Sequence, residues 1–135
     1  MVARAGAGGL LRYELLGPLR VSRAGVTRSP GPAMQGAVLA VLLLHANEPV
    51  PREQIVQAVW GTRATANSGA LVVTYVSRLR RVLEPERARR AAGAVLGSHG
   101  AGYRLAVGAG QLDLHEFEAA RRRARDQRAA GEAAR

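Results

Sequence analysis

Four residues whose side chains can pair with DNA bases recur at helical spacing near the middle of the chain. Ser77 and Arg78 follow Thr74 by three and four positions, and Arg81 follows them by four and three. The four residues therefore share one face of a helix expected over 66–83. A guanidinium group can pair bidentately with guanine or bind phosphate, and a threonine methyl group can contact thymine. The spacing therefore indicates a helix suited to the major groove of duplex DNA.

The opposite face of the same segment is hydrophobic, with Val72, Val76, Leu79 and Leu83 at the matching spacing. An ordinary amphipathic helix with a solvated basic face would share much of this pattern. Solvated helix faces usually mix positive and negative charges, however, whereas the exposed face predicted here has no carboxylate. We therefore favour a helix that binds DNA over one that only faces water.

A glycine-rich segment, 97–102, follows this helix and is flanked by short apolar runs, which predicts a β-hairpin over 95–107. Its glycines allow a tight turn and close approach to another backbone. His99 and Arg104 could reach a minor groove or its phosphates from this hairpin. For His99, a plain exposed turn is an equally good interpretation. A nucleotide-binding loop is a poor one, because such a loop needs a lysine or a following helix.

The elements that must position these residues can be read from the hydrophobic pattern. Alternation over 11–15 and 19–26 predicts an N-terminal antiparallel sheet, with Ala24-Gly25 as a turn. Helical spacing predicts a first helix over 34–45 and a second helix that begins near Pro51 and ends at Gly61. Trp60, near the end of the second helix, is expected mainly in the core, with its indole N–H free to bind a phosphate. The expected fold class is α+β: a winged helix-turn-helix with an N-terminal antiparallel sheet, three helices and a C-terminal β-hairpin wing, plus a C-terminal helix.

Composition narrows the class of protein. The 135 residues carry a net charge of +10, and all 20 basic residues are arginine, which predicts a polyanionic partner. The absence of cysteine excludes disulfides, thiol catalysis and cysteine-based zinc sites, and it fits a reducing cytoplasm. No histidine spacing suggests a metal site, and no serine or carboxylate pattern suggests catalysis. We expect no enzyme, no cofactor, no signal peptide and no membrane span.

Three motifs resemble the OmpR-type winged-helix DNA-binding domain: REQIVQAVWG over 52–61, YVSRLRRVLEP over 75–85 and GAGYRL over 100–105. LLGPLRV over 15–21 and LDLHEFEAARRRA over 112–124 narrow the resemblance to the Streptomyces antibiotic regulatory protein family, of the AfsR/DnrI/RedD type. The resemblance covers nearly the whole chain from Tyr13 onward.

This resemblance implies that the third helix enters the major groove and that the wing, 97–104, touches the minor groove. It also implies tandem binding to promoter direct repeats, recruitment of RNA polymerase, and a place on the cytoplasmic nucleoid, with a homodimer on DNA as a possible form. Carried over by position, the DNA-binding residues are Trp60, Thr74, Tyr75, Ser77, Arg78, Arg80, Arg81, His99 and Arg104. Arg80, Tyr75 and Trp60 would lie nearer phosphates.

Two departures from the family pattern bear on these expectations. Pro51 stands where a serine or threonine usually opens the second helix, which removes a cap of about 1 kcal/mol. The family also continues into an all-helical bacterial transcriptional activation domain, of which 111–135 resembles only the first helix. The expected organisation is thus a disordered N-terminus over 1–10, a winged-helix domain over 11–109 and a truncated activation domain over 111–135.

The leading hypothesis is a sequence-specific DNA-binding regulator, an activator of a secondary-metabolite (antibiotic) gene cluster. One alternative is a protein-partner module whose C-terminal arginine-rich helix docks on an acidic protein. Another is a nonspecific nucleic-acid-binding protein that uses its basic surface on RNA or duplex DNA.

Overall fold

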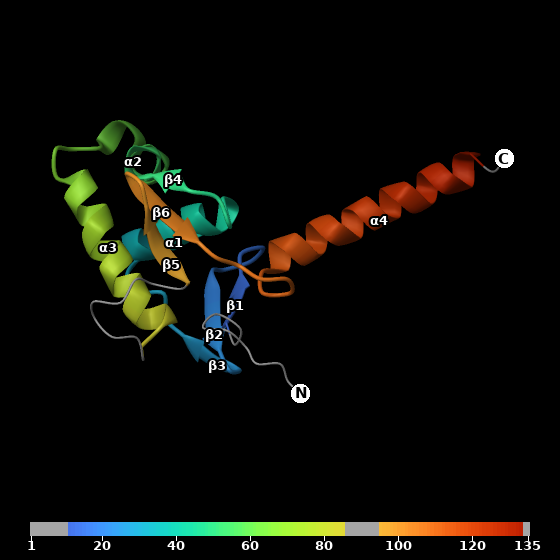
Figure 1. Ribbon diagram of the computed structural model, residues 1–135, viewed down its shortest axis with the longest axis horizontal. Coiled ribbons are helices and arrows are strands. Elements are labelled where there is room, and N and C mark those ends of the chain that lie inside the picture. Colours follow the sequence, from blue (N-terminus) through green and yellow to red (C-terminus); the bar gives the residue numbers. More distant parts are fainter. Residues whose placement is uncertain (1–10, 86–94, 134–135) are drawn as a thin grey trace.

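The computed structural model describes residues 11–85 and 95–133. The fold is α+β, as predicted, and consists of two small antiparallel sheets, three packed helices and a fourth helix that projects from the body (Figure 1). The predicted disorder of 1–10 and the arginine-rich stretch 86–93 lie outside the described residues. The elements in chain order are β1 (Leu11–Glu14), β2 (Arg20–Arg23), β3 (Val26–Arg28), α1 (Ala33–Leu44), β4 (Val50–Pro51), α2 (Arg52–Trp60), the short 3-10 helix η1 (Gly61–Arg63), α3 (Ser68–Leu83), β5 (Leu96–His99), β6 (Gly102–Leu105) and α4 (Asp113–Ala133).

The N-terminal sheet has the order β1-β2-β3, with Tyr13 opposite Val21 in the first antiparallel pair. Ala24 and Gly25 connect β2 to β3 with φ values of 52° and 80°. Two consecutive residues with positive φ form the tight hairpin turn that matches strand twist. Tyr13 is fully buried, and burial raises the pKa of its phenol above the ordinary value.

The core lies where α1, α2 and α3 meet one another and the inner faces of the sheets. Its fully buried leucines come mainly from α1, α3 and the β4-β6-β5 sheet, and the N-terminal sheet adds Tyr13 and Val21, because each element turns one apolar face inward. Aromatic side chains are scarce, so aliphatic packing stabilises this fold. The largest fully buried side chains are Tyr13, Leu39, Leu42, Leu43, Ile55, Leu79, Leu83, Leu96, Leu105 and Leu112.

The second sheet has the order β4-β6-β5, and the hydrophobic pattern did not predict its first strand. Val50 of β4 pairs with Tyr103, and Pro51 pairs with Gly102. A side chain at Gly102 would collide with the carbonyl oxygen of Val50, so glycine is needed for this close approach. Pro51 precedes α2 as its N-cap, without a capping side-chain hydrogen bond, and is not the first helical residue.

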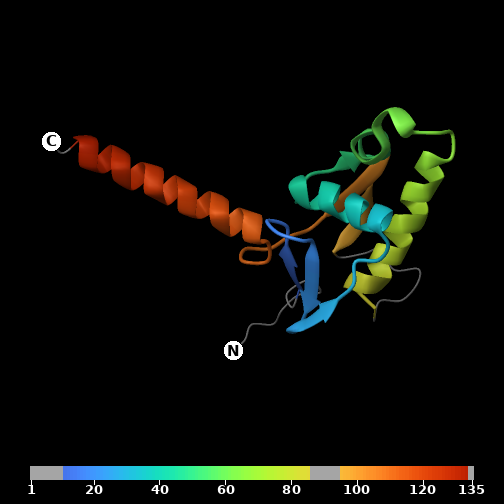
Figure 2. The same cartoon turned by 180° about the vertical axis from the view of Figure 1, so that it is seen from behind.

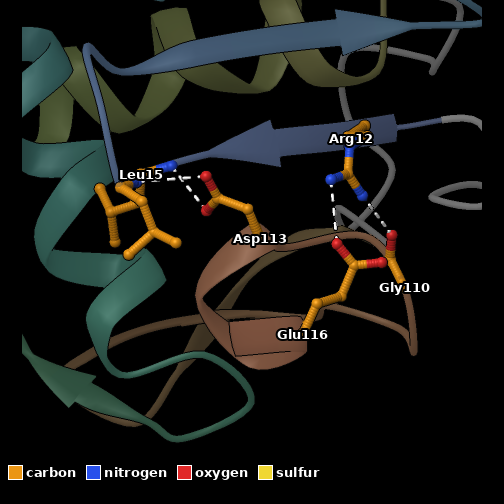
Figure 3. Close-up of polar contacts among 6 residues, drawn as sticks. Arg12, Leu15, Gly110, Asp113 and Glu116 are labelled. Carbon is orange, nitrogen blue, oxygen red and sulfur yellow. Dashed lines mark hydrogen bonds and ion pairs between the residues drawn. The ribbon is translucent and has the colours of Figure 1, made fainter. Parts of the chain in front are cut away.

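A set of polar contacts joins the start of α4 to β1 (Figure 3). The Asp113 carboxylate accepts hydrogen bonds from the backbone N–H groups of Leu15 at 2.8 Å and Leu16 at 3.2 Å. The Arg12 guanidinium donates to a Glu116 carboxylate oxygen at 3.0 Å and to the Gly110 carbonyl at 2.8 Å. The neighbouring Glu116 carboxylate raises the pKa of Arg12. We call this set of contacts the β1–α4 clamp.

Beyond the clamp, α4 extends away from the body and no residue of it is buried (Figure 2). In both views α3 and α4 lie at opposite ends of the molecule. Within residues 11–85 and 95–133, no helix has the length and apolar character that a membrane crossing requires.

Candidate nucleic-acid interface

Helix α3 is divided sharply between a buried face and an exposed one. Val72 and Leu79 are 0% exposed and Val76 is 1% exposed, so these residues fix the helix against the core. Leu83 extends the same face to the last turn. The apolar periodicity predicted this orientation, and the structure confirms it. The helix begins at Ser68, two residues later than predicted, after the polar linker has formed η1 and a turn.

The outward face of α3 presents small polar groups and guanidinium groups to solvent. Thr74, Ser77, Arg78 and Arg81 are all exposed. The helix contains no acidic residue, so nothing on it offsets its arginines. A helix that packs on one side and offers uncompensated donors on the other can approach the floor of a major groove.

Arg80 lies on the flank of α3 that faces the hairpin, and its side chain is engaged within the protein. Its Nε donates to the Leu96 carbonyl at 2.8 Å, and an Nη donates to the Ser98 hydroxyl at 3.0 Å. The guanidinium also lies 5.9 Å from the centre of the Tyr103 ring, within cation–π range. These contacts tie the hairpin to α3. A direct phosphate contact by Arg80, which the sequence resemblance implies, would compete with them.

Trp60 and Tyr75 form one aromatic unit at the junction of α2 and α3. Their rings are nearly parallel, with an interplanar angle of 12° and centroids 6.5 Å apart. Both side chains are half-buried against the core, so part of each remains accessible. The stack fixes the edge of the exposed α3 face, and it leaves both residues as candidate phosphate contacts.

The predicted wing is the β5–β6 hairpin, with its turn at Gly100 and Ala101. The glycine-rich tip is narrower than expected, because Gly97, Ser98 and His99 belong to β5 and Gly102 belongs to β6. His99 is exposed. Arg104 is exposed too, and its Nε donates to the Asn47 carbonyl at 3.0 Å.

The structure adds residues to this surface that the sequence patterns did not single out. Arg52, at the start of α2, is exposed, and its Nε lies 3.6 Å from the position a Cβ on Gly69 would occupy. In the sequence, the only sign that Arg52 belongs to this surface is its position in the first turn of α2. Leu71 and Val73 on α3 are 38% and 43% exposed, although both are apolar.

Metal binding has no candidate in the described parts of the chain. Within 11–85 and 95–133, no group of three or more histidine, aspartate or glutamate side chains could hold a metal ion. His45 lies near Glu48, with Nδ1 and a carboxylate oxygen 3.9 Å apart, but this is a single exposed pair.

Comparison with known sequences identifies this arrangement. Residues 31–105, from α1 through the hairpin, match the family described as "Transcriptional regulatory protein, C terminal". The chain belongs to this family. The region that matches contains α3, the Trp60–Tyr75 stack and both strands of the hairpin.

Curated relatives extend the similarity to nearly the whole chain. "Regulatory protein AfsR" of Streptomyces coelicolor is 38% identical over 125 residues, which cover 92% of this chain and 12% of that protein. "Transcriptional regulatory protein MoaR1" of Mycobacterium tuberculosis is 37% identical over 121 residues, 89% of this chain and 38% of that protein. These relatives bear out the predicted resemblance to the Streptomyces antibiotic regulatory protein family. The chain spans well under half the length of either relative.

A solved structure shows the same fold. "Mycobacterium tuberculosis EmbR in complex with low affinity phosphopeptide" superposes with a TM-score of 0.73 at 33% identity, over 82% of this chain and 28% of that one. The winged-helix prediction is confirmed by this likeness together with the family match. The positions of the individual DNA-binding residues remain predictions.

Proposed function

We propose that the chain is a sequence-specific DNA-binding regulator of transcription, which inserts α3 into the major groove and sets the β5–β6 hairpin against the adjacent minor groove. One observation carries this proposal: α3 buries an unbroken apolar face and exposes a face that has hydroxyls and arginines but no carboxylate. Membership of a transcriptional regulatory family supports the same conclusion.

The residues assigned to DNA fall into two groups. Thr74, Ser77, Arg78 and Arg81 would face base edges, because they are exposed along the centre of α3. A second group surrounds them and would contact backbone phosphates or the minor groove, which positions the protein without reading sequence. This group consists of Trp60, Tyr75, His99 and Arg104, and we add Arg52 because it is exposed at the start of α2.

The finer assignments rest on the family resemblance. We propose that the target is a promoter with direct repeats, that RNA polymerase is recruited there, and that a homodimer can form on it. The regulated genes would form a secondary-metabolite (antibiotic) cluster, and the protein would work at the cytoplasmic nucleoid as an activator and not as an enzyme.

Selection of bound duplexes from a random DNA pool with the full chain tests this function. A specific regulator should enrich a defined motif, and a spaced direct repeat of it would support tandem binding. The affinity for that motif should exceed the affinity for unrelated duplex by at least about 1,000-fold at physiological salt. Failure to enrich any motif, with affinity that collapses as salt rises, would instead indicate nonspecific binding.

The projecting helix α4 favours a second candidate, a module that binds a protein partner. It carries Arg121, Arg122, Arg123, Arg125 and Arg128 on a helix that has no buried residue. A chain shortened after Ala119 keeps the β1–α4 clamp and removes these arginines. DNA selection by the shortened chain should be unchanged if α3 is the binding element.

A further inference from the structure

The exposed surface of α3 changes its chemistry along the helix axis. The N-terminal half presents Ala70, Leu71, Val73 and Thr74, of which Leu71 and Val73 are 38% and 43% exposed. The first charged residue of the helix is Arg78. Exposed hydrophobic side chains also occur elsewhere on the described surface, but Leu71 and Val73 lie beside Thr74 in an uncharged half of one helix, where they can contact the apolar groups of a ligand.

Thr74 adds to the apolar character of this half. Its hydroxyl donates to the Ala70 carbonyl of the same helix at 3.3 Å. The donor is therefore occupied within the helix, and the side chain can offer a base its methyl group and an acceptor lone pair. Ala70 and Thr74 lie on the centre line of the exposed face, with Leu71 and Val73 on its two flanks.

The C-terminal half of the same surface is cationic. Arg78 and Arg81 are exposed, and no hydrogen bond joins either guanidinium to another of the described residues. Arg80, between them in sequence, is held by the hairpin and leaves the other two as the free donors. Guanine N7 and O6 are the base atoms that best fit a free guanidinium in the major groove.

We propose, on the basis of the DNA-binding function above, that each DNA site presents thymine and guanine in a fixed order along the axis of α3, which we call its chemical direction. Thymine methyl groups lie under the Ala70–Thr74 half, and guanine lies under Arg78 and Arg81. The centres of the two halves are about seven residues apart, or roughly 10 Å at 1.5 Å per residue. At about 3.4 Å per base pair, that places thymine and guanine roughly two to four base pairs apart.

Analogue bases in the selected duplex test the proposal. Replacing thymine by deoxyuridine at the apolar end removes only the C5 methyl group, and should weaken binding about fourfold, the equivalent of one buried methyl group. Replacing guanine by 7-deazaguanine at the cationic end removes one acceptor, and should weaken binding about tenfold. Fluorescence anisotropy with the full chain measures both.

Matched protein variants assign each loss to its half of the helix. Thr74→Ser removes one methyl group, so it should weaken DNA binding and also reduce the loss of affinity that deoxyuridine causes. The control Thr27→Ser, on β3, should change neither the affinity nor the deoxyuridine effect. Arg78→Ala should abolish most of the 7-deazaguanine effect, and Arg125→Ala on α4 should leave it intact. All four positions are exposed, so circular dichroism should show native folds.

The outcomes separate this proposal from the function on which it rests. A selected motif that lacks thymine at one end and guanine at the other, or a deoxyuridine effect that Thr74→Ser does not change, would overturn the chemical direction while leaving sequence-specific binding in place. Enrichment of no motif would overturn both.

Discussion

Helices α3 and α4 are both rich in arginine, yet they differ in how that charge is arranged. The 16 residues of α3 include three arginines and no acidic residue, and a continuous apolar face anchors them to the core. The 21 residues of α4 include five arginines and five carboxylates, so the helix has no net charge, and none of its residues is buried. A count of arginines would favour α4 as the DNA-binding element, whereas anchoring and uncompensated charge favour α3.

The largest expected difference between the two helices is in stability. Leu79→Ala on α3 removes a side chain that is 0% exposed, and should lower the free energy of unfolding by about 3 kcal/mol. Phe117→Ala on α4 removes one that is 50% exposed, and should cost under about 1 kcal/mol. Urea denaturation measures both, and equal losses would contradict the anchoring difference.

A difference in DNA affinity should come next. Arg78→Ala should weaken binding to the selected motif by about 1–3 kcal/mol and relax preference at one base pair. Arg125→Ala should change it by less than about 0.5 kcal/mol, because α4 points away from α3 (Figures 1 and 2). Gel shifts with the motif and with single-base variants give both numbers. Indistinguishable effects would remove α3 from its proposed role.

Arg80 sharpens the comparison within α3 itself. Because its guanidinium binds Leu96, Ser98 and the Tyr103 ring, Arg80→Ala should loosen the hairpin and cost about 1–2 kcal/mol of stability. Amide exchange should accelerate over β5, while it stays slow in the core of α3. Unchanged β5 exchange with a reduced salt dependence of DNA binding would show that Arg80 contacts phosphate instead.

The N-terminal sheet should respond to alkaline pH through Tyr13. Burial raises its pKa above the ordinary value of 10.0, so the folded state retains the phenol proton more strongly than the unfolded chain does. The resulting stability is present below pH 10 and is lost as pH rises above it, by about 1.4 kcal/mol at pH 11. Tyr13→Phe should flatten this part of the stability profile. A wild-type slope that persists in the variant would assign it to another group.

The smallest effect is expected from shortening α4. A chain that ends after Ala119 retains Asp113 and Glu116, so its unfolding free energy should change by less than about 0.5 kcal/mol. Asp113→Asn with Glu116→Gln in the full chain should destabilise the β1–α4 junction more than this truncation does. The reverse order, measured by thermal melting, would show that the clamp has no stabilising role.

How much the sequence predicted depended on how far apart the interacting residues lie in the chain. The orientation of α3 was predictable because Val72, Val76 and Leu79 recur at helical spacing within one helix. The turn at Ala24-Gly25 was predictable because the types of two adjacent residues are enough to indicate it. The pairing of β4 with β6 joins segments about fifty residues apart, through a strand of only two residues. No periodicity can develop in so short a strand.

Side-chain roles proved harder to predict than side-chain exposure. Arg80 falls at a helical position that suits phosphate, but the hairpin carbonyl and hydroxyl that engage it come from 16 and 18 residues further along the chain. The Arg12–Glu116 pair spans 104 residues. The pattern of charges along the chain does not show which distant residues will pair. Contacts of this kind are therefore seen only once the sheets and helices are placed in space.

The β1–α4 clamp holds α4 so that anything joined to its C-terminal end is kept at a distance from the body of the protein. At 1.5 Å per residue, a helix of this length reaches about 30 Å, close to the diameter of a small domain. A tag or domain fused there would be carried clear of duplex held by α3, in a direction fixed by Asp113 and Glu116. The same geometry makes the end of α4 a site where a fluorophore could report rotation of the body on DNA without occupying the groove.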